Sequence, residues 1–273
     1  MAETESTYFD PNEFAVRDDG LEERHYWHIH RKRVLAHELG TYLGEDRTTA
    51  RLIELGCGIG TTTTHLNAEG FHVDYSDVFP RALELAEKNA RRRLGPAAET
   101  REFRARDVTQ PLEALAHRGV LLLDVIEHLP DDVAALTHVR EALGDGEDRF
   151  VLVTVPAFQF LWSPWDDIEK HKRRYTRASL AHALEASGFR VERMTFFFSA
   201  LFWAALAVKA GRTVRDTLRG GPRPYVLEEL TEAGFTGQRL NDAMVGILGL
   251  ERPFLRRRGL PLGTSILALA TVA

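Results

Sequence analysis

Short segments rich in apolar and β-branched residues alternate with longer segments of helical periodicity along this chain of 273 residues. Residues 119–126 form a nearly continuous apolar run, which is typical of a strand buried on both faces of a parallel sheet. The patterns predict seven strands, at residues 51–55, 71–77, 103–108, 119–126, 149–156, 189–198 and 263–272. They predict helices at residues 21–43, 61–69, 81–94, 131–143, 176–187 and 240–250.

This alternation decides the fold class. Strands and helices that follow one another through short connections form open, mostly parallel sheets with helices on both faces. We therefore predict an α/β fold with a Rossmann-like, seven-stranded sheet. In such sheets, ligands bind beyond the carboxyl ends of the strands, so residues at those ends are the candidates for function.

Two segments depart from the regular alternation. Residues 1–20 have few apolar residues and no periodicity, so we expect a mobile N-terminal arm. Residues 21–272 are predicted to form one domain, with residues 199–262 as an insertion that serves as a lid or a dimer interface. Residues 194–208 carry no charge, but these 15 residues fall short of the roughly 20 that span a bilayer. A buried or partner-facing helix is expected there, with a peripheral membrane contact as the alternative.

A glycine-rich turn follows the first predicted strand. The order from Glu54 is Glu-x-Gly-x-Gly-x-Gly, and glycine lets the backbone take positive φ and come close to a ligand. A dinucleotide-binding fingerprint would need another glycine at position 61, where Thr61 stands. The Glu54 carboxylate would repel a pyrophosphate and suits an ammonium group. The turn therefore favours a cationic cofactor without phosphates.

Acidic residues recur where the next predicted strands end. Asp77 ends the second strand, Asp107 the third and Asp124 the fourth. A carboxylate at the end of the second strand can accept hydrogen bonds from both hydroxyls of a ribose. Asp74 is the alternative for that role.

Three stretches resemble motifs of the class I S-adenosylmethionine-dependent methyltransferases. The glycine turn resembles their first motif. The segment that begins at Asp77 resembles their second motif, and only Asp77, unlike Asp74, keeps the motif's spacing to Pro80. Residues 124–132, Asp-Val-Ile-Glu-His-Leu-Pro-Asp-Asp, resemble the fourth motif of the small-molecule enzymes.

The resemblance implies S-adenosylmethionine as cofactor and transfer of its methyl group to an oxygen, nitrogen or carbon of a small molecule. It implies that Glu54 holds the methionine end, Asp77 the ribose and Asp107 the adenine side. The other implied cofactor-binding positions are Gly56, Cys57, Gly58, Gly60, Val78, Val108 and Asp124. It also implies that the last strand runs antiparallel beside the sixth.

An aromatic and basic block follows the fifth predicted strand and is expected to cover the pocket. Its pattern, Trp-Ser…Asp…His-x-Arg-Arg-Tyr-Thr, resembles one bacterial branch of the family, with Lys170 where that branch has Gly. The candidate substrate-binding residues are Trp162, Asp166, Arg173, Arg174 and Tyr175. The arginines could hold an anionic group, or Asp166 could pair with an arginine or His171 and lock the loop.

Two histidines are candidate catalytic residues, because an imidazole near neutral pH can accept a proton. His128 follows the fourth strand, where it could face the transferred methyl group or cap the next helix. His171 lies in the aromatic and basic block. A base is needed only where the acceptor carries a proton.

Composition narrows the function further. The formal net charge of −5 and the sequence pI of about 6.1 argue against a nucleic-acid partner. The single cysteine, Cys57, excludes an intramolecular disulfide and a multi-cysteine zinc site, and we predict no metal ligands. A cytoplasmic enzyme with a planar or anionic small-molecule substrate is expected. The alternatives are a cofactor-binding regulator or partner subunit without activity, and an NAD-dependent oxidoreductase, which Thr61 disfavours.

Overall fold

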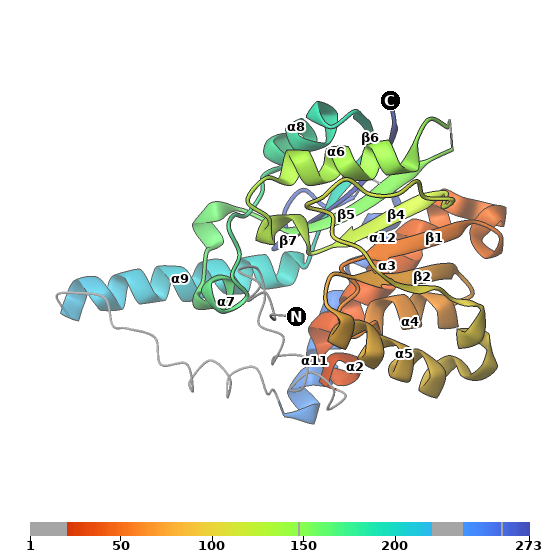
Figure 1. Cartoon of the computed structure of the whole chain (residues 1–273). Helices are drawn as coiled ribbons and strands as arrows, with labels where there is room; N and C mark the ends of the chain where they lie inside the picture. Colours follow the sequence, from red (N-terminus) through yellow and green to blue (C-terminus); the bar gives the residue numbers. More distant parts are fainter. Residues whose placement is uncertain (1–20, 147, 220–236, 258) are drawn as a thin grey trace.

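The computed structural model describes residues 21–146, 148–219, 237–257 and 259–273. They form one sheet with helices packed on both faces (Figure 1). The predicted arm at residues 1–20 lies outside the described residues, as do residues 220–236 of the predicted insertion.

The sheet has seven strands in the order β3-β2-β1-β4-β5-β7-β6. The strands are β1 (Arg51–Leu55), β2 (His72–Asp77), β3 (Phe103–Ala105), β4 (Gly119–Leu123), β5 (Phe150–Pro156), β6 (Phe189–Phe197) and β7 (Ser265–Val272). Strands β1 to β5 pair in parallel, whereas β7 pairs antiparallel with both β5 and β6. The predicted sheet, with its antiparallel last strand, is confirmed.

Helices connect these strands much as the periodicity predicts. The α-helices are α2 (Leu21–Arg24), α3 (Tyr26–Leu43), α4 (Thr61–Ala68), α5 (Pro80–Leu94), α6 (Asp132–Leu143), α7 (Pro164–Ile168), α8 (Arg177–Ala186), α9 (Ser199–Arg219), α11 (Gln238–Gly249) and α12 (Arg252–Arg257). The 3-10 turns are η1 (Gly44–Thr48), η2 (Gly95–Thr100), η3 (Ile126–His128) and η4 (Gln159–Leu161). The single helix predicted for residues 21–43 is wrong, because His25 takes an extended conformation and its ring accepts from the Trp27 amide, which begins a new helix.

Strand β4 is buried on both faces, as its apolar run predicts. Val120 and Leu122 join the core that includes residues of α6 and α8, whereas Leu121 and Leu123 join the core that includes residues of α3 and α4. Alternate side chains point to opposite faces of a strand, so an unbroken apolar run fits a strand between two helical layers.

The uncharged segment at residues 194–208 is divided between β6 and α9. Phe202 is buried, but Trp203 and Val208 are 58% and 55% exposed, and α9 extends past the edge of the sheet (Figure 1). The expectation of a buried helix is therefore wrong from Trp203 onward, because α9 leaves the sheet after its first turn, and the partner-facing alternative stays a prediction. Among the described residues, no helix combines the length and apolarity needed to cross a bilayer.

The order of the strands fixes where a ligand can bind. The chain passes from β1 outward through β2 to β3, and then returns to place β4 on the other side of β1. The loops after β1 and β4 therefore run in opposite directions and leave a crevice at the carboxyl edge of the sheet. Residues at the ends of these two strands are the first candidates for a functional site.

We expect Gly119→Ala to destabilise the fold. A Cβ at position 119 would lie 2.3 Å from Cζ of the fully buried Phe150 ring. Overpacking of this kind costs about 1–3 kcal/mol, which denaturant unfolding measures. The control is Gly246→Ala in α11, where no atom lies within 4 Å and alanine should raise helix stability by up to about 1 kcal/mol. Equal stabilities for the two variants would contradict the packing described for β4.

Candidate active site

The glycine turn brings the loops after β1 and β4 into contact. Gly56, Gly58 and Gly60 all take positive φ, between 54° and 83°. A Cβ at Gly56 would lie 2.7 Å from Cγ2 of Val125, and a Cβ at Gly60 would lie 2.8 Å from Cβ of Ala86. The turn therefore requires glycine both for its conformation and for the close approach of its neighbours.

Glu54 lies at the end of β1, buried beneath this turn. The hydroxyl of Thr63 donates a hydrogen bond to its Oε2. Burial raises the pKa of Glu54 to about 7, while the Thr63 hydrogen bond and the nearby Arg31 charge act in the opposite direction. The negative charges of Asp77 and Asp124 raise the pKa further. A cationic ligand group would stabilise the ionised form of this carboxyl group.

Asp77 ends β2 and lies against the glycine turn. Its Oδ2 accepts from the Gly58 amide at 2.8 Å, and its Oδ1 accepts from the Phe79 amide at 3.0 Å. Burial raises the pKa of Asp77, whereas hydrogen bonds from the backbone amides of Phe79, Gly58 and Val78 act in the opposite direction. The neighbouring Val78 is exposed.

Asp74 has a different role. It is fully buried and accepts hydrogen bonds from the side chain of Arg51 at 2.9 Å and the amide of Glu102 at 2.8 Å. The His117 ring lies 3.0 Å from its Oδ2. These contacts hold β2 to the strand and the loops beside it, so Asp77 and not Asp74 is the acid that faces the glycine turn.

Asp107 lies beyond the third strand, which is shorter than predicted and ends at Ala105. The Asp107 carboxylate accepts from the amide and the hydroxyl of Thr109, at 2.9 Å and 2.7 Å. This local pairing forms a turn in place of the three further strand residues that were predicted. Val108 is buried, and its carbonyl lies 3.0 Å from Nδ1 of His138.

Asp124 follows β4, which ends at Leu123, three residues earlier than predicted. Asp124 takes a φ of 58°, in the left-handed region that few residues other than glycine adopt. The Arg31 Nη2 atom of α3 lies 2.7 Å from its Oδ2, and Arg31 Nη1 donates to the Thr62 hydroxyl at 3.0 Å. Sequence reasoning missed Arg31, because a single arginine in an amphipathic helix carries no signal of a partner 93 positions away.

Glu127 is a second residue that sequence reasoning missed, although it lies inside the motif that begins at Asp124. Its side chain is completely buried, and neither carboxylate oxygen has a hydrogen-bond partner among the described residues. Burial and the nearby charge of Asp124 raise its pKa well above the usual value for a glutamate. Such a group is costly unless something else pairs with it.

The two predicted catalytic histidines lie together. The ring centroids of His128 and His171 are 4.7 Å apart, with the rings nearly perpendicular. Burial and the proximity of His171 lower the pKa of His128 to about 4, so its ring is neutral at pH 7. His128 does not cap α6, whose cap is the Asp131 side chain.

Asp166 organises the aromatic and basic block. It is fully buried, and it accepts from the Ser163 amide and from Nε and Nη2 of Arg174, at 2.7–2.8 Å. Nδ1 of His171 lies 2.8 Å from its Oδ1. These hydrogen bonds hold the pKa of Asp166 far below its usual value despite its burial. Lys170 takes a φ of 55°, the conformation that glycine adopts most readily.

The side chains of the other predicted substrate-binding residues also form hydrogen bonds with neighbouring residues of the chain. Arg173 donates to Asp132 and to the Leu129 carbonyl, at 2.8 Å and 2.9 Å. The Tyr175 hydroxyl donates to Asp132 at 2.6 Å. Trp162 donates from Nε1 to Asp167. These contacts favour the locked loop over a substrate clamp for Asp166, Arg174 and Tyr175, whereas the Arg173 side chain remains 32% exposed.

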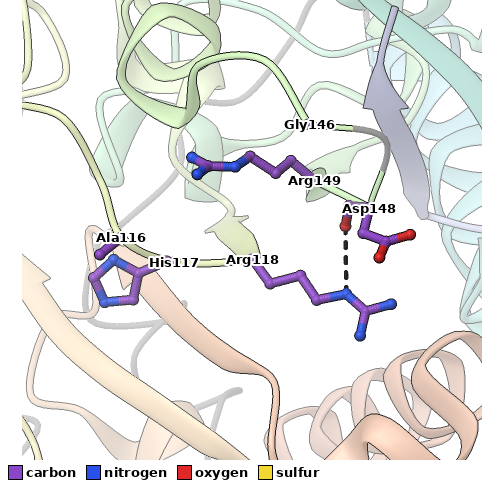
Figure 2. A pocket seen from close by; sticks show the side chains of 6 residues that line it. All are labelled: Ala116, His117, Arg118, Gly146, Asp148 and Arg149. Carbon is purple, nitrogen blue, oxygen red and sulfur yellow. Dashed lines mark hydrogen bonds between the residues drawn. The ribbon is translucent and has the colours of Figure 1, made fainter.

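A pocket of ≈ 350 Å³ lies elsewhere, at the amino-terminal ends of β4 and β5. Figure 2 shows its lining, in which Arg118 donates to the Asp148 carbonyl. The lining residues are Ala116, His117, Arg118, Gly146, Asp148 and Arg149. None of the predicted site residues borders it, because they gather at the opposite, carboxyl edge of the sheet.

Comparisons with known proteins identify the family of the chain. A family model described as "Methyltransferase domain" matches residues 26–193. The Ubiquinone biosynthesis O-methyltransferase of Cereibacter sphaeroides (strain KD131 / KCTC 12085) is 35% identical over 101 residues. That match covers 35% of this chain and 38% of the relative, well under two thirds of its length.

Two solved structures share the fold at low identity. A chain of the complex between the Haloferax volcanii Trm112 methyltransferase activator and a proposed methyltransferase has a TM-score of 0.57 and 16% identity. The match covers 96% of this chain and 95% of that one. Haemonchus contortus Phosphoethanolamine N-methyltransferase 2, in complex with S-adenosyl-L-methionine, has a TM-score of 0.52 and 17% identity, over 87% of this chain and 52% of that one.

We expect Asp166→Asn to lower the free energy of unfolding by about 3–5 kcal/mol, because it leaves the Arg174 guanidinium without its buried counter-charge. Denaturant unfolding measures the change. The matched control is Asp167→Asn, since Asp167 is exposed and receives one hydrogen bond from Trp162. A loss no larger than the control's would contradict the structural role of Asp166.

Proposed function

The chain belongs to the methyltransferase-domain family, and from this premise we propose that it transfers a methyl group from S-adenosylmethionine to a small-molecule acceptor. The observation that carries the proposal is the position of Glu54 and Asp77 around a turn that requires glycine. One carboxyl group lies beneath the turn and the other beside it, at the crevice where ligands bind in sheets of this kind.

The residues at this edge fit the cofactor. Glu54 would pair with the ammonium group of the methionine end. The pKa of this buried carboxyl group is about 7, and an opposite charge beside it stabilises its ionised form. The Asp77 oxygens accept backbone hydrogen bonds, and a carboxylate has about four acceptor positions, which leaves room for a ribose hydroxyl. Asp107 and Val108 would border the adenine. Gly56, Cys57, Gly58 and Gly60 let the backbone approach the ligand.

The bound cofactor supplies a methyl group on a positively charged sulfur, which needs a nucleophile in line with the carbon–sulfur bond. The protein therefore has to align the acceptor, exclude water and receive any proton that leaves the acceptor. Asp124 and His128 follow β4, the His171 ring lies beside that of His128, and this is where we place the acceptor. The product carries the methyl group on its oxygen, nitrogen or carbon, and the demethylated cofactor, S-adenosylhomocysteine, leaves.

The acceptor is proposed to be a planar or anionic small molecule. The similarity to an O-methyltransferase of ubiquinone biosynthesis supports an oxygen acceptor. Arg173, which keeps part of its guanidinium exposed beside the crevice loops, is the residue we propose to bind an anionic group. The single cysteine supports a reducing compartment such as the cytoplasm.

Calorimetric titration with S-adenosylmethionine and S-adenosylhomocysteine tests the cofactor site. We expect both to bind, and we expect Asp77→Asn to weaken each by about 1–3 kcal/mol, because the amide loses a charge-assisted hydrogen bond to the ribose. Asparagine keeps one acceptor oxygen and so one of these two backbone hydrogen bonds, and a thermal melt verifies the fold. Unchanged affinity in Asp77→Asn would refute the ribose assignment, and binding without methyl transfer to any acceptor would indicate a regulator.

Cofactor binding should also depend on pH. Only ionised Glu54 pairs with an ammonium, and its pKa is about 7 in the cofactor-free protein. Raising the pH from 6 to 7 increases the ionised fraction, so the affinity should rise about fivefold. Glu54→Gln should bind more weakly, and its affinity should no longer rise over this range. The same pH dependence in wild type and Glu54→Gln would show that another group titrates.

A further inference from the structure

Three side chains of the metal-binding types converge beside the proposed acceptor position. Glu127 and His128 come from the turn η3, and His171 comes from the loop that follows α7. One potential ligand atom from each lies within 4.8 Å of those from the other two. Ligand atoms at about 2.0–2.2 Å from a shared ion lie roughly 3–4 Å from one another, so a shift of about 1 Å would close the site.

The protein already holds one of these ligands in a metal-binding orientation. Nδ1 of His171 lies 2.8 Å from Oδ1 of Asp166, and a carboxylate with a low pKa can only accept, so Nδ1 carries the proton. In the neutral ring, the lone pair of His171 is then on Nε2. A carboxylate behind a histidine is the usual support of a metal ligand, because it fixes the tautomer and the ring orientation. Asp166 is itself locked in place by Arg174.

The other two side chains carry potential ligand atoms that have no hydrogen-bond partner among the described residues. Both carboxylate oxygens of Glu127 and Nδ1 of His128 are buried and unpaired within the part of the chain that the structure describes. The charges of Asp124 and Glu169 add to that of Glu127, and Arg31 is the cation that acts on Glu127 in return. The surroundings therefore favour a bound cation.

We propose that Glu127, His128 and His171 bind a divalent transition-metal ion. One carboxylate and two imidazoles are a ligand set that suits Zn²⁺ and similar ions, whereas Mg²⁺ and Ca²⁺ prefer oxygen ligands alone. Three protein ligands leave a position open for the acceptor. A metal there would bind an acceptor oxygen and favour its deprotonated, nucleophilic form. This role rests on the proposed function, but binding of the ion does not.

Calorimetric titration of the tag-free, metal-stripped full chain with Zn²⁺ tests the site. We expect one Zn²⁺ ion to bind per chain at this site, with higher affinity than at any other site of the chain. Glu127→Gln and His171→Asn should each lower that affinity at least tenfold. Glutamine preserves the volume of the buried side chain, and thermal melts verify that each variant folds. The control is His182→Asn, which removes an exposed histidine of α8 and should leave the affinity unchanged.

Titration of Co²⁺ into the same proteins provides a second readout, since its visible spectrum reports nitrogen and oxygen ligation directly. Failure of Zn²⁺ to bind, or equal affinities in wild type and Glu127→Gln, would overturn the inference, as would selective binding of Mg²⁺. Binding of S-adenosylmethionine is measured separately. If the protein binds Zn²⁺ but not S-adenosylmethionine, only the proposed function is refuted. If it binds S-adenosylmethionine but not Zn²⁺, only the metal site is refuted.

Discussion

Repulsion between buried carboxyl groups is the constraint on which this edge of the sheet depends. Asp124 lies close enough to both Glu54 and Glu127 for its charge to act on each, and the burial of the two glutamates removes the water that would screen it. Arg31 is the counter-charge that reaches them from α3, across the loops of β1 and β4. The helix that precedes the sheet in sequence therefore completes the site as well as the core.

Arg31 neutralises only part of this charge, which explains why the edge suits cations. Its Nη2 atom contacts Asp124, and its Nη1 atom donates to Thr62. Glu54 is left with one hydroxyl donor and Glu127 with no partner among the residues described. An ammonium at Glu54 and a metal ion at Glu127 would each pair with a carboxyl group that the protein leaves unsatisfied. The two proposals thus follow from one electrostatic imbalance.

Local patterns in the sequence were enough to predict most of the sheet and the acids at its edge. The apolar run before Asp124 predicts β4 as a central strand, and the spacing to Pro80 selects Asp77, which contacts the glycine turn, over Asp74. The errors lie where side chains compete with the backbone pattern. Asp107 forms a turn with Thr109 and shortens the third strand, and His25 begins a new helix where one continuous helix was expected.

Contacts across long sequence separations could not be predicted in the same way. The aromatic and basic block left two interpretations open, an arginine that holds a substrate anion or an Asp166 that locks the loop, and only the fold shows that Asp166 binds Arg174 and that Tyr175 donates to Asp132 at the start of α6. Lys170 keeps the left-handed conformation without glycine, which costs energy that the Asp166 hydrogen bonds offset. A loop held in this way presents His171 in one orientation before any ligand arrives. Rigid support of that kind is what either a metal ion or a methyl acceptor would require, because both depend on atoms placed to within a fraction of an ångström.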